Sequence, residues 1–316
     1  MLFPFCRKRK ENFSDLAQKI NPKIGIIAGG GALPVALANY LEEKQQPLFV
    51  LALKGHADKK AFPNTVPLKE IRLGAIGKAF QLLKKNGVEK IVFIGSVKRP
   101  SFSEIRPDLK GLSFLAKLSL KALGDDGLLR FVIKEVENKG FDVVGIHDLM
   151  PKLLVPKGVL THQKPSKKDI VDIERGFSVA KILGEADVGQ AVIVQQGIVL
   201  SVEGIEGTKA LIERTKHLKR KGDGGVLVKA IKPQQDNRID MPTIGPETVK
   251  SIFDAGLKGI AVETGKVLLA EAEKTIELAD KLNIFIVGVH NGATNLKDET
   301  TGKTNKDIRK KYKKRK

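Results

Sequence analysis

The segment from Gly224 to Gly245 holds most of the side chains in this sequence that could do chemistry. It begins with an apolar run at 226–228 and closes on a proline, a threonine and a glycine. Between these ends stand cations, amides and two carboxylates, namely Lys229, Lys232, Gln234, Gln235, Asp236, Arg238 and Asp240. Such groups between two prolines indicate a rigid loop at the end of a strand. Cations suit a phosphate, and carboxylates suit a divalent metal or the activation of water, so we predict the active site here.

Two further carboxylates stand at the end of another expected strand, in the run VLSVEGIEGT. Glu203 and Glu206 lead through Gly207 and Thr208 into an expected helix. Thr208 fits the N-cap of that helix, which is one interpretation. The other is that a helix N-terminus beside two carboxylates and the loop at 229–245 serves a phosphate and its metal ion.

A glycine turn lies near the start of the chain, where Gly29, Gly30 and Gly31 follow an expected strand and precede a helix. Their N–H groups could face a phosphate at the helix N-terminus, or the turn could simply need tight packing. The turn is a weak dinucleotide fingerprint, because Pro34 stands at the third glycine position and the second strand ends without a carboxylate.

Polar residues also follow the next strand and open a later helix. Ser96 and Arg99 come after Gly95, at the strand end where open α/β sheets bind ligands. Arg99 could hold a phosphate through two hydrogen bonds, or it could be an exposed loop residue. Asp125 and Asp126 fit a helix cap, with a role facing the ligand as the alternative.

The elements that must position these groups alternate between strand and helix, which predicts α/β structure. We expect two α/β domains, of which the N-terminal one is a Rossmann-like doubly wound sheet, joined by a linker rich in Pro and Lys. A hairpin is expected within 189–207. The predicted divisions are an N-terminal extension (1–22), the Rossmann-like domain (23–150), the linker (151–168), a C-terminal catalytic domain (169–292) and a basic disordered tail (293–316).

Composition narrows the class of protein. The chain has 316 residues, 41% of them apolar, and a single cysteine, Cys6, which excludes an internal disulfide and a thiolate zinc cluster. With no apolar run near the roughly 20 residues of a membrane span, we expect a cytoplasmic protein. The formal net charge of +20 is concentrated at 7–10 and 303–316. These termini are either solvated tails or contacts to the inner membrane surface, and no nucleic acid partner is expected.

Six ordered motifs carry a resemblance that covers Lys23 to Val289. They are IAGGGALP at 27–34, GSVKRPSF at 95–102, GDDGLLR at 124–130, ADVGQAVIV at 186–194, GIVLSVEGIEGT at 197–208 and GVLVKAIKPQQDNRIDMPTIG at 225–245. Together they resemble the two-domain UDP-2,3-diacylglucosamine pyrophosphatases of lipid A biosynthesis found in many alphaproteobacteria. This family is unrelated to the calcineurin-like phosphoesterases that catalyse the same reaction.

The resemblance implies hydrolysis of UDP-2,3-diacylglucosamine to 2,3-diacylglucosamine 1-phosphate and UMP, by attack of water at the α-phosphorus. It also implies a divalent cation, typically Mg²⁺. The essential aspartate of the family falls on Asp240, and Asp236 stands where the family keeps an acid. Ser96 and Lys209 depart from the asparagine and aspartate that are usual there, and Lys209 puts any carboxylate role at its position in doubt.

Residues and resemblance together give a set of predicted roles. Asp240 and Asp236 are predicted to be catalytic, and Asp240, Glu203 and Glu206 to bind the metal. The predicted substrate-binding residues are Gly29, Gly30, Gly31, Ser96, Arg99, Asp125, Asp126, Thr208, Lys229, Lys232, Gln235, Arg238 and Thr243. The alternative function is that of another nucleotide-sugar or nucleotide-binding enzyme, and a homo-oligomer is left open.

Overall fold

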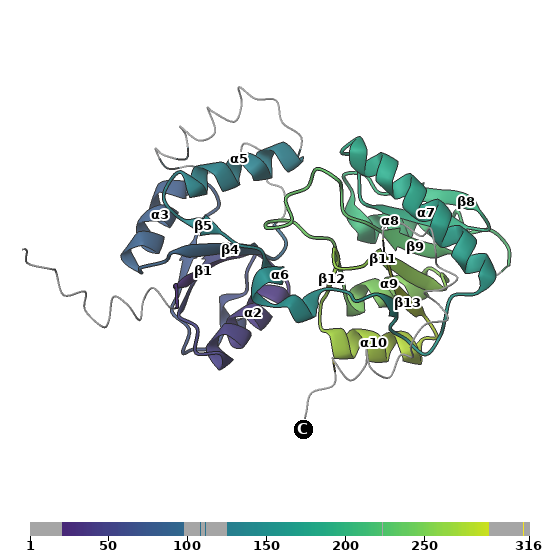
Figure 1. The fold of residues 1–316 in the computed structure, drawn as a ribbon, viewed down its shortest axis with the longest axis horizontal. Coiled ribbons are helices and arrows are strands. Elements are labelled where there is room, and N and C mark those ends of the chain that lie inside the picture. The colour runs from purple at the N-terminus through teal and green to yellow at the C-terminus, as the bar shows by residue number, and fades with distance from the viewer. Residues whose placement is uncertain are drawn as a thin grey trace, which may run out of the picture. The chain divides into compact units, whose positions relative to one another are not determined.

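The computed structural model describes residues 21–97, 108, 111, 125–222, 224–290 and 312, with the backbone alone for Asp125 and Asp126. It divides into two compact units, each of α/β structure (Figure 1). The first unit comprises Met1–Lys121 and Ile133–Val144, and the second comprises Ala122–Val132 and Gly145–Lys316. The predicted fold class of two α/β domains is therefore confirmed.

A five-stranded parallel sheet in the order β3-β2-β1-β4-β5 forms the first unit. Its strands are β1 (Ile24–Ala28), β2 (Leu48–Leu53), β3 (Leu68–Ile71), β4 (Lys90–Ile94) and β5 (Asp142–Val143), and its helices include α2 (Leu33–Glu43) and α3 (Ile76–Lys85), with α5 (Asp125–Glu137) leading into β5. Every residue of β2 is buried, as expected for a parallel strand covered on both faces. The strand order reverses between β1 and β4, so this is the doubly wound topology.

The second unit contains a mixed six-stranded sheet in the order β6-β13-β11-β9-β7-β8. Its strands are β6 (Gly158–Val159), β7 (Ala191–Gln195), β8 (Ile198–Val202), β9 (Val226–Lys229), β11 (Gly259–Glu263) and β13 (Phe285–Val289), and β10 (Thr243–Ile244) pairs with β12 (Leu268–Leu269) in a small second sheet. β9, β11 and β13 are parallel, whereas β7 and β8 form the expected hairpin.

Helices cover both faces of the large sheet because its strand residues alternate between two cores. Val226 and Val228 face α7 (Lys167–Glu185), whereas Leu227 faces the opposite core. That opposite core is covered by α8 (Gly207–Thr215), α9 (Pro246–Asp254) and α10 (Ala272–Lys281). Figure 1 shows α7 running diagonally across the sheet. A Cβ at Gly176 would lie 2.3 Å from Val228 Cγ2, so glycine is what allows α7 to approach β9.

Short elements complete the second unit. They are α6 (Ile146–Leu149) and a 3₁₀ turn at Pro151–Leu153, while a further 3₁₀ turn at Lys59–Ala61 belongs to the first unit. Tyr312 packs against the core beneath α8, α9 and α10, and its hydroxyl donates to Leu154 O at 3.2 Å. Among the described residues, no helix combines the length and apolar character that crossing a bilayer requires.

Candidate active site

The carboxyl ends of β8, β9 and β11 meet at one edge of the large sheet. β7 runs antiparallel to both β8 and β9, so β8 and β9 run in the same direction and β11 follows them. This carboxyl edge therefore brings together Glu203, just after β8, Lys229, the last residue of β9, and Glu263, the last residue of β11. Groups that are far apart in the sequence become neighbours because the strand directions agree.

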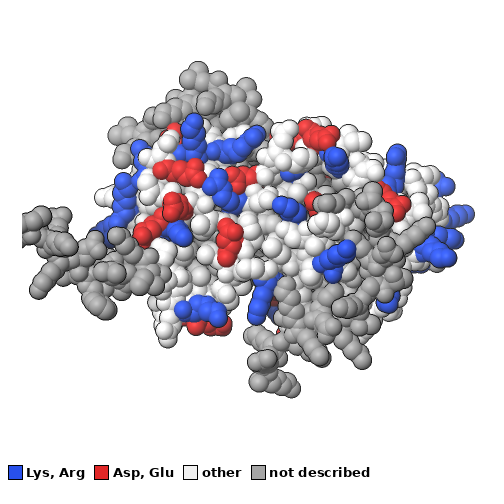
Figure 2. Space-filling model, in the orientation of Figure 1, with Lys and Arg blue, Asp and Glu red and all other residues white. Residues whose placement is uncertain are grey.

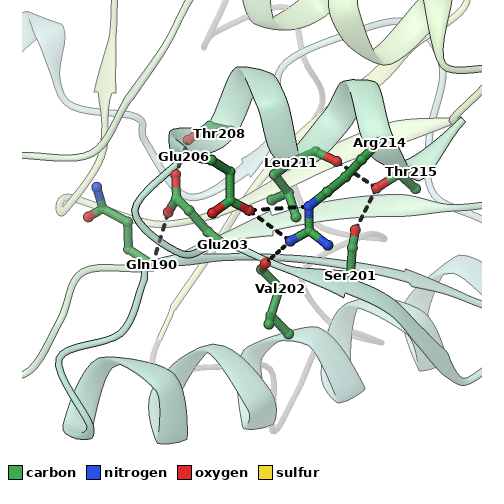
Figure 3. A network of polar contacts seen from close by, with 9 residues as sticks. All are labelled: Gln190, Ser201, Val202, Glu203, Glu206, Thr208, Leu211, Arg214 and Thr215. Atoms are coloured by element: carbon green, nitrogen blue, oxygen red, sulfur yellow. Dashed lines mark hydrogen bonds and ion pairs between the residues drawn. The ribbon is translucent and has the colours of Figure 1, made fainter.

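Lys229 lies at the centre of a buried polar network at this edge. Its Nζ donates to Thr208 Oγ1 at 3.0 Å and to Thr243 O at 3.3 Å. The Thr208 hydroxyl in turn donates to Glu203 Oε1 at 2.6 Å, and the backbone N–H of Gln190 donates to Glu203 Oε2 at 3.1 Å. Figure 3 shows Glu203 directed toward Gln190 and Thr208. Thr208 thus serves Glu203 and Lys229, whereas the N-cap position of α8 is Glu206, which makes no side-chain cap hydrogen bond.

Burial governs the electrostatics of this network. Lys229 and Glu203 are only 6% and 5% exposed. Burial lowers the pKa of Lys229, while the carboxylates of Glu203 and Asp240 act in the opposite direction. A buried charge must be paired to be tolerated, so Lys229 and these two carboxylates depend on one another. The hydrogen bonds of Lys229 described above are internal to the protein.

The loop after β9 carries Asp240, and hydrogen bonds from groups of the same loop hold it in place. Gln235 is buried, and its amide donates to Asp240 Oδ2, while its Oε1 accepts from Lys232 N at 3.4 Å. The backbone N–H of Asp240 donates to Asp236 O at 3.3 Å, and Ile231 N donates to Glu263 Oε2 at 3.2 Å. The carboxylate of Asp240 is therefore held by the loop itself.

The cations of this loop are both held by aspartates. Arg238 Nη2 contacts Asp236 Oδ2 at 2.8 Å, and its Nε contacts Asp236 Oδ1 at 3.0 Å. The hydrogen bond from Arg238 is the main reason that the pKa of Asp236 lies below its usual value. Lys232 Nζ contacts Asp187 Oδ1 at 2.6 Å. The Arg238 side chain is 37% exposed, whereas that of Lys232 is only 11% exposed.

Glu206 is separated from Glu203 although the two are neighbours in sequence. Glu206 Oε1 pairs with Arg214 Nη2 at 2.8 Å and with Arg214 Nε at 3.2 Å, as Figure 3 shows. Its own backbone N–H, followed by Arg214, lowers the pKa of Glu206. Arg214 also donates to Val202 O. The pair fastens α8 to the end of β8.

The predicted metal ligands do not form one cluster. In the part of the chain that the structure describes, no group of three His, Cys, Asp or Glu side chains is arranged to hold a metal ion. Glu206 pairs with Arg214, and both oxygens of Glu203 accept internal hydrogen bonds. Mg²⁺ is often held by one or two carboxylates, with water and substrate phosphates completing its shell. Of the three predicted ligands, Asp240 is the one whose carboxylate could hold Mg²⁺ in that form.

In the first unit, the glycine turn that was predicted to bind a phosphate is in close backbone contact with the residues that follow β4. Gly30 N donates to Ser96 O at 2.8 Å, and Ser96 N donates to Gly30 O at 2.9 Å. Gly29 N donates to Ile94 O at 2.8 Å, and a Cβ at Gly29 would lie 2.6 Å from Ser96 O. The N–H groups of Gly29 and Gly30 are thus used within the fold. Gly31, with φ of +94°, adopts the left-handed conformation that favours glycine.

Some predicted residues lie outside what the structure describes, and some contributors were missed. Arg99 lies outside the described residues, as do the side chains of Asp125 and Asp126, which open α5. Three residues that hold the polar groups of the site were not predicted individually, namely Asp187, Gln190 and Glu263. Two signals could have revealed them. Asp187 and Gln190 stand in the motif ADVGQAVIV, and Glu263 ends an apolar strand.

The chain is a two-domain α/β protein with a buried charged network at one edge of its large sheet. Comparison with known proteins identifies its family. The LpxI N-terminal domain model matches residues 23–153, and the LpxI C-terminal domain model matches residues 156–287. The chain belongs to the LpxI family, which confirms the resemblance seen in its motifs.

A curated relative matches nearly from end to end. UDP-2,3-diacylglucosamine pyrophosphatase LpxI of Caulobacter vibrioides is 40% identical over 274 residues, which is 84% of this chain and 97% of that protein. Among solved structures, N5-carboxyaminoimidazole synthase from Aspergillus clavatus, in complex with ADP and 5-aminoimidazole ribonucleotide, shares 11% identity with a TM-score of 0.21 over 63% of this chain and 44% of its own. That likeness is too small to carry an argument.

Proposed function

We propose that this protein is a hydrolase that cleaves the pyrophosphate bond of UDP-2,3-diacylglucosamine in lipid A biosynthesis. The products are 2,3-diacylglucosamine 1-phosphate and UMP. The observation that carries the proposal is the 40% identity to the Caulobacter vibrioides pyrophosphatase, over 97% of its length. The match extends through both family domains, so it covers the glycine turn of the first and the loop of the second.

Asp240 is the residue to which we assign the activation of water. Its carboxylate is oriented by Gln235, and a carboxylate oriented in this way can align a water molecule and accept its proton. The water oxygen bonds to the α-phosphorus of the UDP unit while the bridging P–O bond breaks. UMP then carries the new oxygen, and the diacylated sugar keeps its phosphate.

The remaining charged groups of the loop have different tasks in this proposal. Arg238 is oriented by Asp236, and Lys232 by Asp187. Arg has five N–H donors and Lys has three, so each can also donate to a phosphate oxygen and offset its charge. The positive charge of Lys229 compensates the negative charges of Glu203 and Asp240 within the protein. Asp236 thus contributes through Arg238, whereas Asp240 is the catalytic residue.

A requirement for Mg²⁺ is part of the proposal. Asp240 would hold the ion together with phosphate oxygens and water. When bound, Mg²⁺ offsets the negative charge of the pyrophosphate.

The cytoplasmic location and peripheral contact with the inner membrane are proposed as well. The basic runs at 7–10 and 303–316 support membrane contact, because basic segments are attracted to anionic lipid headgroups.

The test is UMP release from UDP-2,3-diacylglucosamine with Mg²⁺, for wild type, Asp240→Asn and Asp254→Asn. Asp254 is a matched control because it is exposed and pairs with Lys250 at 3.0 Å on α9. We expect Asp240→Asn to lower kcat by about 10²–10³-fold or more, whereas Asp254→Asn stays within about twofold. EDTA should abolish release by the wild type.

Three outcomes would change the proposal. A fully active Asp240→Asn would transfer the catalytic role to Asp236. Full activity in EDTA would remove the metal. No release by the wild type would reject this substrate and favour another nucleotide sugar.

A further inference from the structure

The amino edge of the large sheet, opposite Lys229, carries an exposed basic loop. Residues 216–222 lead toward the start of β9, and all seven are exposed. Four of them are basic, namely Lys216, Lys219, Arg220 and Lys221. Leu218, in the middle of the loop, is 47% exposed. Exposed cations therefore stand on both sides of an exposed leucine.

The loop is held in place by a buried side chain. Gln195, at the end of β7, is fully buried, and its amide makes two hydrogen bonds with the backbone of Arg220. Its Oε1 accepts from Arg220 N at 2.9 Å, and its Nε2 donates to Arg220 O at 3.2 Å. The neighbouring Gln196 donates to Lys221 O at 3.0 Å. The sheet thus presents these cations on an ordered loop.

Further apolar side chains are exposed at the same edge. A Cβ at Gly256 would lie 2.8 Å from Lys219 Nζ, so Lys219 lies over the turn that ends α9. In that turn Gly256 N donates to Phe253 O at 2.8 Å, and the Phe253 side chain is 50% exposed. Ile198, which begins β8 beside the same loop, is 45% exposed. Lysines and apolar side chains are therefore exposed at the same edge of the sheet.

We propose that this surface, formed by loop 216–222 with Ile198 and Phe253, docks on an anionic lipid bilayer. Basic side chains are attracted to anionic headgroups, and exposed apolar side chains enter the boundary with the acyl chains. Figure 2 shows Lys and Arg side chains at the right-hand end of the view, the end at which Figure 1 labels β8. The acidic residues near this surface are Asp254, which pairs with Lys250, Glu213, one turn of α8 before the loop, Asp172, which accepts the N–H groups of Gln196 and Gly197, and, in the sequence, Asp223.

A bilayer fits this chemistry better than a nucleic acid. Single-stranded nucleic acids are bound through several aromatic side chains on which bases stack, whereas among the described residues this surface exposes the ring of Phe253 and the imidazole of His217. An exposed leucine and isoleucine gain nothing from a phosphate backbone, whereas they suit a lipid boundary. The inference goes beyond the proposed hydrolysis, because the docking residues lie at the sheet edge opposite Lys229 and Asp240.

The absence of tryptophan in this chain gives a sharp test. Leu218→Trp places a single reporter on the proposed surface, and Ile205→Trp places one on an isoleucine that is 90% exposed at the carboxyl edge. With vesicles of phosphatidylglycerol and phosphatidylcholine, the emission of Leu218→Trp should shift to the blue and be quenched by brominated lipid. Ile205→Trp should change little. A shift in Ile205→Trp alone, or equal shifts in both, would overturn the proposal.

A second measurement tests the charges in the full chain, with its terminal segments present. Lys219→Glu with Lys221→Glu should weaken cosedimentation with anionic vesicles by about tenfold or more. The matched control reverses Lys181 and Lys266, two lysines that are also exposed. UMP release from detergent-dispersed substrate should be unchanged in both double variants, which shows that they fold. Equal vesicle binding by the two double variants would contradict the proposal, as would loss of binding to single-stranded RNA with vesicle binding intact.

Discussion

The two edges of the sheet in the second unit use the same residue types in opposite ways. At the carboxyl edge Lys229 is 6% exposed and is enclosed by Thr208, Thr243, Glu203 and Asp240. At the amino edge the lysines of loop 216–222 are all exposed, while the amide of Gln195 and the carboxylate of Asp172 are buried and hydrogen-bonded to the backbone. Burial is what separates the two, because a buried charge requires a partner and an exposed one does not.

The difference in burial between the two edges decides which kind of chemistry each can perform. A buried and paired lysine costs desolvation free energy, but it orients the carboxylates around it. An exposed lysine keeps its hydration and acts at longer range on an anionic surface. The carboxyl edge is therefore suited to act on one substrate, and the amino edge to attract an extended partner.

The largest expected effect comes from breaking the buried pair. Lys229→Met leaves Glu203 charged and without its cation, so we expect a loss of about 3–5 kcal/mol in the free energy of unfolding. Adding Glu203→Gln should recover at least about 1 kcal/mol of that loss, because the unpaired charge is removed. Urea unfolding of the two single variants and the double variant measures the coupling.

The control for this cycle is Lys219→Met at the exposed edge, which should change stability by less than about 0.5 kcal/mol. Equal effects of Lys229→Met and Lys219→Met would contradict the contrast between the two edges.

A smaller loss is expected when the amide that holds the basic loop is removed. Gln195→Ala gives up the hydrogen bonds to Arg220, at a cost of about 1–3 kcal/mol. The freed loop should be cut faster by trypsin after Lys219, Arg220 and Lys221, since proteolysis follows local opening. Mass spectrometry of the fragments locates the cuts. The control is Gln81→Ala, at an exposed glutamine of α3 in the first unit, and similar cleavage in both variants would mean that Gln195 does not hold the loop.

Alkaline pH offers a test at a buried phenol. Burial raises the pKa of Tyr312 to about 12, whereas an unfolded tyrosine titrates near 10. The folded state keeps the proton longer, so this contribution to stability is complete below about pH 10 and is lost as pH rises toward 12. Solvent screening of this partly exposed ring limits the loss to about 1 kcal/mol. Thermal melts of Tyr312→Phe between pH 9 and 11, beside Tyr40→Phe, should show a flatter pH dependence in Tyr312→Phe alone.

The smallest effect is expected at Glu206. Its pair with Arg214 is partly exposed, so Glu206→Gln should cost no more than about 1 kcal/mol and leave UMP release within about twofold. The concentration of Mg²⁺ that gives half-maximal activity should also be unchanged. A large rise in that concentration would instead restore Glu206 as a metal ligand.

Much of the fold was predictable because local patterns report local structure. The alternation of apolar strands with amphipathic helices predicted both α/β domains, and the hairpin followed from two apolar runs around Gln196 and Gly197. The loop after Val228 was predicted from its prolines and charges. Ordered motifs along the chain indicated the LpxI family, which the domain matches confirm.

Only the tertiary structure decided which partner each polar group takes. Glu203 and Glu206 are three residues apart, yet one joins Lys229 through Thr208 and the other joins Arg214. Gly29 and Gly30 use their N–H groups on the strand end beside them. Each choice depends on strand directions and burial, which bring together residues far apart in the chain. A sequence can determine which groups are available, whereas the packed sheet determines which of them meet.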